Sequence, residues 1–460
     1  MITDFDVLVI GAGPAGATAA LKASALGARV ALVDKRRTGG TCTNTGCVPT
    51  RVLAITARLL RDIRGAGAYG IEVSSPMLEW KTTTSRVRQV IGDVQNVKRV
   101  QDKLRDAGGE LFLEGAASFL DAHTVKLSDS GRELQAEKII LCVGGKARRP
   151  PIPGVEFAIT PEQIVDLEHL PKSVVIVGSG YTGVQVTTIM NAFGANVTLL
   201  ETAPNILPPA DADVARALRE GFERQGVKVI TGISGIERIE LEPNGLRRLT
   251  YSSNAAVHSL EAEAVILAVG WPAALENLGI VEIGLETERG FLKVNTFLQT
   301  NLEHIFVAGD ANGQDMLVQG ANFEAEVAAE NAVRGAKLEY DRDSLPSGGF
   351  TDPDHAGVGY TEARAKSEGI KYRVAVARYS DLERAIIDNR TAGFLKLISD
   401  SSGVIIGAHA AGENAVEVMQ AVATAMAAHA TATTLANVRF AYPTYTAIVG
   451  EAARKLVARV

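Results

Sequence analysis

Residues 7–34 read VLVIGAGPAGATAALKASALGARVALVD, and residues 174–201 read VVIVGSGYTGVQVTTIMNAFGANVTLLE. Each stretch has four apolar residues, a G-x-G-x-x-G motif, a helix-like segment, and a second apolar run that ends in an acid. The first glycine and the acid are 23 positions apart in both copies, from 11 to 34 and from 178 to 201. The repeat therefore predicts two strand–helix–strand units of the kind that binds dinucleotides.

The glycines of each repeat have separate physical roles. The first permits a tight turn after the strand, the second lets the backbone approach a pyrophosphate, and the third lets the helix pack closely on the strand. In that order they are Gly11, Gly13 and Gly16 in the first repeat and Gly178, Gly180 and Gly183 in the second. The phosphates would lie at a helix N-terminus. Asp34 and Glu201 would accept hydrogen bonds from ribose hydroxyls. The alternative is a pair of glycine-rich turns without a ligand.

Two nucleotide sites in one chain suggest a flavin and a nicotinamide cofactor. A third segment favours this interpretation, because the apolar run Ile305–Val307 precedes AGDANG at 308–313. Asp310, at the end of a predicted strand and beside glycines, can reach a polyol chain such as the flavin ribityl. An ordinary turn explains this segment equally well.

Composition limits the class of protein. The 460 residues suggest about three domains, and 46% hydrophobic with 22% charged residues is ordinary for a globular chain. With a net charge of −6, the chain as a whole does not attract nucleic acid electrostatically. Three cysteines in 460 residues exclude a secreted disulfide scaffold. The sequence has no signal-peptide pattern and no apolar run of ~18 residues. We expect a cytoplasmic protein that binds neither nucleic acid nor membrane.

Helix and strand periodicities organise the rest of the chain. Apolar residues at near-helical spacing predict one long amphipathic helix over Lys81–Arg105. The polar stretch DRDSLPSGG, 341–349, is typical of a linker. Beyond it we expect an α+β unit. Its predicted strands are 372–377, 394–398 and 404–409, and its predicted helices lie near 361–368 and 413–430.

Two cysteines follow the first repeat. Cys42 and Cys47 lie in GGTCTNTGCVPT, 39–50, where glycines allow a tight path that can bring two Cα atoms within about 7 Å. In a reducing compartment such a pair is more often catalytic or redox-sensing than structural. Two metal ligands or two unrelated thiols are the alternatives, although no nearby Cys or His completes a metal set. Cys142, after the predicted strand 138–141, is expected to be a buried small residue.

The order of these segments resembles the class I pyridine nucleotide–disulfide oxidoreductases, which include dihydrolipoamide dehydrogenase, glutathione reductase and mercuric reductase. The resemblance covers nearly the whole chain. The matching segments are GAGPAG, GGTCTNTGC, GSGYTG, AGD at 308–310, FTDPDHAGVG at 350–359 and GAHAAGENAVEVM at 407–419. The implied fold is α/β, with two Rossmann-like nucleotide-binding domains as in glutathione reductase and an α+β C-terminal dimerisation domain.

The resemblance also implies domain limits and a quaternary state. The FAD-binding domain would comprise 1–148 and 273–338, with an NAD(P)-binding domain, 149–272, inserted between them. The dimerisation or interface domain would be 339–460. The family's enzymes are homodimers, so a homodimer is expected, with a small-molecule or small-thiol substrate.

In the family, electrons pass from a reduced nicotinamide through FAD to a redox-active disulfide. The resemblance therefore makes Cys42–Cys47 that disulfide, with Cys47 as the charge-transfer thiolate near the flavin and Cys42 as the interchange thiol facing substrate. Such thiols act as thiolates. Beyond the glycines and acids of the two repeats, the cofactor-binding residues implied are Gly40, Thr41, Gly144, Gln185, Gly270 and Asp310.

The chain departs from the family pattern near its C-terminus. The family's disulfide reductases have His–Pro–Thr there, with a Glu five residues after the His, and this His from the partner subunit is the acid–base group. This chain has Tyr442–Pro443–Thr444 and Ala447 instead. Tyrosine, with a reference pKa near 10, is a poor base at pH 7 but can donate a hydrogen bond to a thiolate. The family's mercuric reductases and soluble transhydrogenase also have Tyr at this position.

Two further departures concern the cofactors. Arg51 occupies the place of a Lys that pairs in the family with a Glu, and this chain has Gln185 in place of the Glu. Either the unneutralised cation stabilises reduced flavin and thiolate, or the change is a neutral swap that keeps one hydrogen bond. The family's Gly–Arg–x–Pro is Gly270–Trp271–Pro272 here, which implies that the nicotinamide cofactor is bound differently.

The function predicted is an FAD-dependent oxidoreductase that passes electrons from NADH through the cysteine pair to a disulfide or a metal ion, as in mercuric reductase. NADPH is less favoured, because Glu201 would repel a 2′-phosphate and positions 202–207 contain no arginine. Arg247 or Arg248 reaching the pocket is the alternative. A dihydrolipoamide dehydrogenase-like enzyme, a quinone or diaphorase-type reductase, and a flavin-bearing redox sensor with little turnover remain the competing functions.

Overall fold

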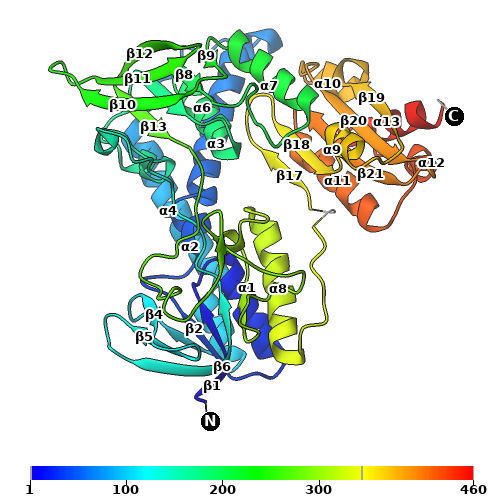
Figure 1. Ribbon diagram of the computed structural model, residues 1–460. Helices are drawn as coiled ribbons and strands as arrows, with labels where there is room; N and C mark the ends of the chain where they lie inside the picture. Colours follow the sequence, from blue (N-terminus) through cyan, green and yellow to red (C-terminus); the bar gives the residue numbers. More distant parts are fainter. Residues whose placement is uncertain (1–2, 343–344, 459–460) are drawn as a thin grey trace. The chain divides into compact units, whose positions relative to one another are not determined.

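The computed structural model describes residues 3–342 and 345–458, and the chain forms two compact units (Figure 1). The first unit comprises Met1–Val52, Thr82–Arg148 and Gly270–Arg342. The second comprises Leu53–Lys81, Arg149–Val269 and Asp343–Val460. Within the described ranges, no helix is long and apolar enough to cross a membrane.

The sheet of the first unit is built on the first repeat. Strands β1 (Phe5–Ile10), β2 (Val30–Val33), β3 (Glu110–Phe112) and β6 (Glu133–Leu141) pair in parallel in the order β3-β2-β1-β6. The long β6 also pairs with β16 (Ile305–Val307) in parallel and with β5 (Thr124–Leu127) antiparallel, and β5 pairs with β4 (Ala117–Phe119). A small hairpin joins β14 (Thr287–Glu288) and β15 (Phe291–Leu292).

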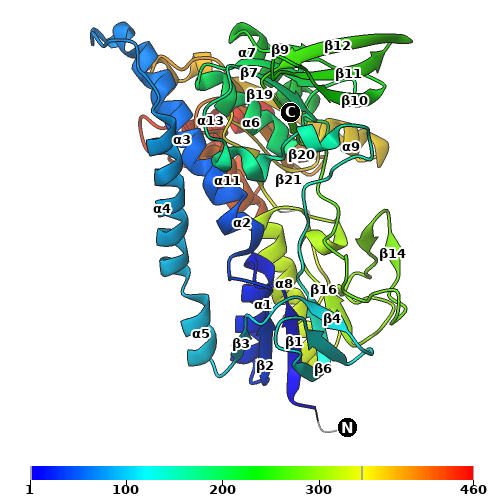
Figure 2. The same cartoon turned by 90° about the vertical axis from the view of Figure 1, so that its left-hand side faces the viewer.

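Two alanine-rich helices pack side by side in this unit (Figures 1 and 2). They are α1 (Pro14–Ala25) and α8 (Val318–Arg334). Proline at the first turn of α1 suits a helix start, because its missing N–H would lack an intrahelical partner there. The small side chains allow a close approach to the sheet, and the core contains Ala15, Ala19, Ala23, Ala325, Ala328 and Ala329.

The prediction of one continuous helix over Lys81–Arg105 is wrong. The structure has α4 (Trp80–Lys98) and α5 (Val100–Asp106), separated by Arg99, whose left-handed backbone (φ 44°) breaks the helix. The bend brings Val100 and Leu104 into the core formed with α1. Burial of these two side chains thus accounts for the break between α4 and α5. The spacing of apolar residues along the sequence does not show where this break falls.

In the second unit, the second repeat forms a parallel sheet. Its strands are β7 (Ser173–Val177), β8 (Asn196–Leu200), β9 (Lys228–Ile230) and β13 (Ala264–Leu267), in the order β13-β7-β8-β9. Helices α6 (Tyr181–Ala192) and α7 (Ala212–Arg224) follow β7 and β8. An antiparallel sheet contains β10 (Gly235–Leu241), β11 (Arg247–Ser253) and β12 (Ala256–Ala262).

The two repeats have the same register. Val7 pairs with Val30 in the first, and Val174 pairs with Val197 in the second. Both repeats are therefore strand–helix–strand units with the predicted topology.

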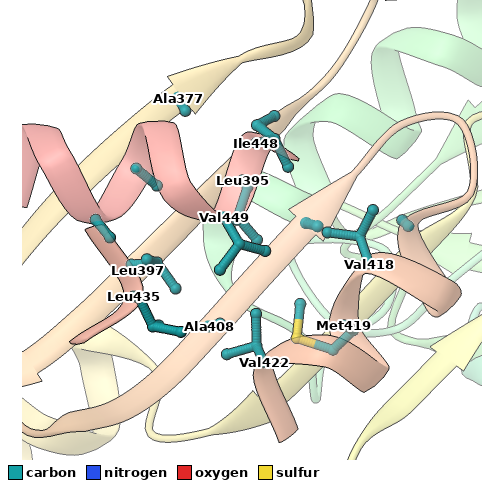
Figure 3. Close-up of a cluster of buried hydrophobic side chains, with 14 of the residues drawn as sticks. Ala377, Leu395, Leu397, Ala408, Val418, Met419, Val422, Leu435, Ile448 and Val449 are labelled. Carbon is teal, nitrogen blue, oxygen red and sulfur yellow. The ribbon is translucent and has the colours of Figure 1, made fainter. Parts of the chain in front are cut away.

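The C-terminal part of the second unit is an α+β layer. Its sheet has the antiparallel order β17 (Ser347–Gly349), β18 (His355–Gly359), β21 (Ile405–Ala411), β20 (Phe394–Asp400) and β19 (Tyr372–Arg378). Its helices are α9 (Glu362–Ser367), α10 (Glu383–Ile387), α11 (Ala415–Ala427), α12 (Ala432–Asn437) and α13 (Ala447–Val457). Figure 3 shows Val418, Met419 and Val422 of α11 and Ile448 and Val449 of α13 gathered with sheet residues in one buried cluster.

The predicted linker 341–349 needs a correction. Ser347–Gly349 is a strand, β17, that pairs with β18, so the polar segment ends earlier than its composition indicated. Residues 343–344 of that segment lie outside the described residues. This strand forms because its backbone pairs with β18, which lies more than five residues further along the chain. The polarity of the segment itself does not reveal that pairing.

Candidate active site

A tight turn joins the two cysteines that follow the first repeat. Cys42 is half-buried in the short helix α2 (Gly40–Asn44), and Cys47 is the exposed first residue of α3 (Cys47–Gly65). The backbone N–H groups of Thr45 and Gly46 both donate to the carbonyl of Thr41, at 3.0 and 2.7 Å, which reverses the chain. Both cysteines are thiols in this structure, and the reversal brings them into hydrogen-bonding contact.

The two thiols differ in acidity. The Cys42 thiol donates a hydrogen bond to Cys47, which lowers the pKa of Cys47 to about 7 and raises the pKa of Cys42. The positive charge of Arg51, one turn along α3, also lowers the pKa of Cys47. The start of a long helix favours a negative charge as well. Near neutral pH, the stable arrangement is a Cys47 thiolate that accepts a hydrogen bond from a Cys42 thiol.

The glycine turns of the first unit meet beside this pair. The N–H of Gly39 donates to the carbonyl of Ala12 at 2.7 Å, which joins the cysteine loop to the first glycine motif. A Cβ on Gly40 would lie 2.7 Å from the Cα of Gly13, so the beginnings of α2 and α1 touch. Thr41 is the next residue of α2 and is half-buried. The structure thus brings Gly13, Gly40 and Thr41 together.

The first glycine motif also shows why its outer glycines are needed. Gly11 has a φ of +104°, and a Cβ on Gly16 would lie 1.6 Å from the Gly11 carbonyl oxygen. No side chain caps the start of α1 at Gly13 in the described part of the chain. The first N–H groups of α1 are therefore directed outward, as binding of a phosphate requires.

Two carboxylates flank this region. Asp34 accepts hydrogen bonds from the N–H groups of Ala12 at 2.7 Å and Arg36 at 3.2 Å. Asp310 lies close enough to Cys42 and Cys47 for its negative charge to raise the pKa of both thiols, and burial raises the pKa of Asp310 itself. Gly144 has a φ of +69° and open space at its Cβ position. A helix start with N–H donors and no cap, a close glycine approach and two carboxylates that can accept hydrogen bonds from hydroxyls are a combination that fits FAD.

The second glycine motif repeats this arrangement. Gly178 has a φ of +95°, and a Cβ on Gly183 would lie 1.9 Å from the Gly178 carbonyl oxygen. Gly180 precedes α6 without a side-chain cap in the described chain, and its Cβ position faces open space. The N–H of Ser179 donates to Glu201 at 2.8 Å, as the N–H of Ala12 does to Asp34. Both acids thus hold the middle residue of their own glycine turn, a contact that the spacing alone did not reveal.

Glu201 makes further hydrogen bonds. Its carboxylate also accepts from the Ser179 hydroxyl at 2.6 Å, the Thr202 hydroxyl at 3.1 Å and the Ala203 N–H at 2.8 Å. Burial acts to raise the pKa of Glu201, but these hydrogen bonds outweigh it and lower the pKa. The carboxylate is therefore charged and fixed at the end of β8.

Three other predicted residues have defined positions. Gln185 donates from Nε2 to the carbonyl of Tyr181 at 2.9 Å and accepts at Oε1 from the N–H of Phe350 at 3.5 Å. Gly270, with φ +109°, belongs to the first unit, where its carbonyl accepts from the N–H of Arg148 at 3.0 Å. Tyr442 belongs to the second unit and is 79% exposed.

Sequence reasoning missed polar residues around the cysteine turn. Lys98 and Gln95, at the end of α4, donate hydrogen bonds to Thr43 and Asn44 of α2. Glu324 of α8 is fully buried and accepts from the N–H of Gly309 at 2.6 Å, next to Asp310. In the sequence, the only feature that pointed to Gln95 and Lys98 was that they are polar residues at the end of an amphipathic helix.

This architecture, with two dinucleotide-binding repeats and a hydrogen-bonded thiol pair beside the first of them, is that of a nucleotide-dependent thiol oxidoreductase. The family model of pyridine nucleotide-disulphide oxidoreductases matches residues 5–325, and that of their dimerisation domain matches residues 345–453. The chain therefore belongs to the pyridine nucleotide-disulphide oxidoreductases.

Individual relatives agree with this assignment. A dihydrolipoyl dehydrogenase of Haloferax volcanii is 32% identical over 98% of this chain and 96% of the relative. A mercuric reductase of Bacillus cereus is 28% identical over 91% of this chain and 66% of the relative. The HOCl-induced flavoprotein disulfide reductase RclA of Escherichia coli, in its Cu(II) complex, superposes with a TM-score of 0.85 and is 26% identical, with 98% of this chain and 99% of that chain covered.

These comparisons confirm the fold and the class of activity expected from the sequence. The protein is an oxidoreductase of a family that uses FAD and NAD(P)H, and it carries the family's dimerisation domain.

Proposed function

We propose that the protein transfers electrons from NADH, through FAD and the Cys42–Cys47 pair, to a disulfide or a metal ion. The hydrogen-bonded thiol pair, joined by its loop to the first glycine motif, is the observation that carries this proposal. FAD, when bound, supplies the exchange of electron pairs between nicotinamide and thiols. Gly13, Asp34 and Asp310 are the residues proposed to hold it.

The chain's own residues supply the thiol chemistry. Arg51 and the start of α3 keep the negative charge on Cys47, while Cys42 holds the proton. To reduce a disulfide, the Cys42 sulfur attacks one sulfur of the acceptor and releases the other, which takes up the proton that Cys42 held. The Cys47 thiolate then attacks the Cys42 sulfur of the mixed disulfide and releases the second acceptor sulfur, which takes a proton from water. The acceptor gains two electrons and leaves as a dithiol, and Cys42–Cys47 becomes a disulfide.

The class of electron acceptor is proposed from the residues near the C-terminus. Tyr442 replaces the family's acid–base histidine, and Ala447 replaces its glutamate, which disfavours lipoamide or glutathione. Relatives include a mercuric reductase and a flavoprotein disulfide reductase solved as a Cu(II) complex, which supports a metal ion as the alternative acceptor. We propose that the protein acts as a homodimer, in which Tyr442 of one subunit would serve the cysteine pair of the other.

Anaerobic titration with NADH tests the electron route. The expected result is a flavin–thiolate charge-transfer band after two electrons, followed by turnover with a disulfide, Hg(II) or Cu(II). Turnover with quinones alone would favour a diaphorase-type reductase. A band without turnover on any acceptor would favour a redox sensor.

Purified protein should contain about one FAD per chain. The uncapped start of α1 can bind the pyrophosphate, and we propose Asp34 and Asp310 as the acceptors for a ribose and the ribityl chain. Release of the flavin by denaturation, followed by chromatography against FAD and FMN standards, measures this. Recovery of FMN, or of no flavin, would contradict the proposed cofactor site.

We expect kcat/KM for NADH to exceed that for NADPH by roughly tenfold or more, since tenfold corresponds to about 1.4 kcal/mol. The buried, charged Glu201 would repel a 2′-phosphate. Arg247 donates to the carbonyls of Gly245 and Glu263, and Arg248 pairs with Glu261, so both candidate cations already have partners close to them in the chain or on the neighbouring strand.

Ferricyanide as the acceptor isolates the nicotinamide step for this comparison. A Glu201→Gln variant is the matched control, because it keeps the size of the side chain and one acceptor oxygen at the turn while it removes the charge. The preference for NADH should fall in this variant. An NADH to NADPH ratio at or below one in the wild type would refute the proposed preference.

A further inference from the structure

The turn that carries Cys42 is held by side chains from α4. Lys98, the last residue of α4, donates from Nζ to the hydroxyl of Thr43 at 2.8 Å. Gln95, three residues earlier on the same helix, donates from Nε2 to Oδ1 of Asn44 at 2.7 Å. Both contacts join residues more than fifty positions apart in the sequence, and α4 lies beside α2 in both views (Figures 1 and 2).

The two residues that accept these hydrogen bonds, Thr43 and Asn44, are themselves held in place. Thr43 is completely buried, so its hydroxyl cannot move to another donor without repacking. Asn44 also donates from Nδ2 to the carbonyls of Thr38 at 3.1 Å and Gly40 at 2.9 Å. The two residues that follow Cys42 are thereby fixed, and the position of the Cys42 sulfur follows from theirs.

Lys98 also places a positive charge near Cys42. The titratable groups that face Cys42 are Cys47, Lys98 and Asp310. The hydrogen bond to Cys47 and the charge of Asp310 raise the pKa of Cys42, and Lys98 lowers it. Arg51 acts in the same way on Cys47. Each thiol therefore has one cation whose charge lowers its pKa, Lys98 for Cys42 and Arg51 for Cys47.

This arrangement bears on a step that the proposed mechanism requires. Cys42 can attack an acceptor only as a thiolate, yet the stable state keeps the proton on Cys42. Moving that proton along the existing hydrogen bond to Cys47 creates the Cys42 thiolate without a change in net charge. Arg51 favours the state before this transfer, and Lys98 favours the state after it.

We propose that Lys98 is the positioning residue for the interchange thiol: it fixes the Cys42 turn through Thr43 and stabilises negative charge on Cys42 when the proton moves to Cys47. Lys98 thereby takes over, within one subunit, part of the role that the missing His–Glu dyad would have. This inference rests on the function proposed above.

Site-resolved alkylation tests the proposal. Holoenzyme reduced with dithiothreitol is treated with iodoacetamide between pH 6 and 9, and the rate at Cys42 is read from peptide masses. In Lys98→Met, alkylation of Cys42 at pH 7.5 should slow by about tenfold or more, and its pH profile should move upward. A nearby cation shifts a pKa by about one unit or more, and one unit is tenfold in thiolate population.

Three further variants separate charge from packing. Lys98→Arg keeps the charge, and Cys42 should react within about threefold of the wild-type rate. Lys98→Gln keeps a hydrogen-bond donor for Thr43 without the charge, so it should resemble Lys98→Met and provides a second test if the latter folds poorly. Lys103→Met, which removes an exposed lysine from α5, should leave the rate unchanged.

Two results would overturn the proposal: wild-type alkylation of Cys42 in both neutral variants, or equal slowing in Lys98→Arg with an unshifted pH profile. The reduction of flavin by NADH is measured separately on the same proteins. If NADH fails to reduce the wild-type flavin, the proposed function is contradicted. The alkylation rates after dithiothreitol still decide the role of Lys98.

Discussion

Replacing Cys42 or Cys47 with serine should abolish the reduction of disulfide or metal-ion acceptors, with a loss of roughly 10³-fold or more in kcat, as expected when a nucleophile is removed. Each sulfur is needed, since one attacks the acceptor and the other resolves the mixed disulfide. Steady-state NADH oxidation with each acceptor, and with ferricyanide for comparison, measures the effect. Transfer to ferricyanide or quinones should persist, because it does not require the thiols.

A matched control separates this effect from misfolding. Cys142→Ala removes the third cysteine, which is buried in the core of the first unit, and should leave thiol-dependent turnover intact. All three variants should retain FAD. If Cys42→Ser and Cys47→Ser both reduced disulfides or metal ions at the wild-type rate, the dithiol relay would be dismissed.

The cysteine variants also differ in a spectroscopic signature. The hydrogen bond from Cys42 is the largest cause of the low pKa of Cys47. Serine at position 42 can still donate, whereas alanine cannot. The charge-transfer band requires the thiolate, so it is present above the pKa of Cys47 and is lost below it. In Cys42→Ala the band should therefore disappear at a higher pH than in Cys42→Ser.

Combining Tyr442→His with Ala447→Glu should raise turnover with small disulfides such as lipoamide by about 10²-fold or more, because general acid–base groups typically contribute 10²–10⁴-fold. Tyr442 is exposed in the single chain, so a histidine there meets no packing conflict within its own subunit. Ala447 is the first residue of α13, where a glutamate is favoured by the helix dipole and can hold the histidine in its orientation. Steady-state kinetics with NADH and lipoamide measures the gain.

The control for this variant is Tyr442→His with Ala447→Gln, which keeps the size of the second side chain but not its charge. It should show a smaller gain. FAD content and ferricyanide turnover report on folding. If the His–Glu variant binds FAD and gains nothing on any disulfide, then the absent dyad does not limit this enzyme, and the shape of the acceptor site does.

The sequence predicted the architecture well wherever the signal was local. Glycines at fixed spacing and apolar runs of strand length specify a strand–turn–helix through neighbouring residues, and β16 has the predicted bounds. The same signal located the cysteine turn, because Gly39 and Gly40, both with positive φ, come three and two residues before Cys42 in the chain. Composition alone did not reveal β17, which depends on its pairing with β18.

The arrangement of groups within the candidate site was less accessible. The direction of the Glu201 carboxylate depends on a turn 22 residues earlier, and the Lys98–Thr43 contact joins segments 55 residues apart. Neither pairing leaves a periodic pattern in the sequence. The break at Arg99 has the same origin, because it is decided by what Val100 and Leu104 pack against.

The sequence by itself determined the two dinucleotide-binding repeats, the cysteine pair and the absence of the family's His–Pro–Thr motif, since each depends on residue identity at fixed local spacing. The resemblance to the family already implied that Cys47 is the thiolate. Only the tertiary structure decided which cation acts on which thiol and how the acids at the strand ends are engaged. The physical reason is that charges and hydrogen bonds act through space over a few ångströms. Folding brings those groups together from positions that are distant along the chain.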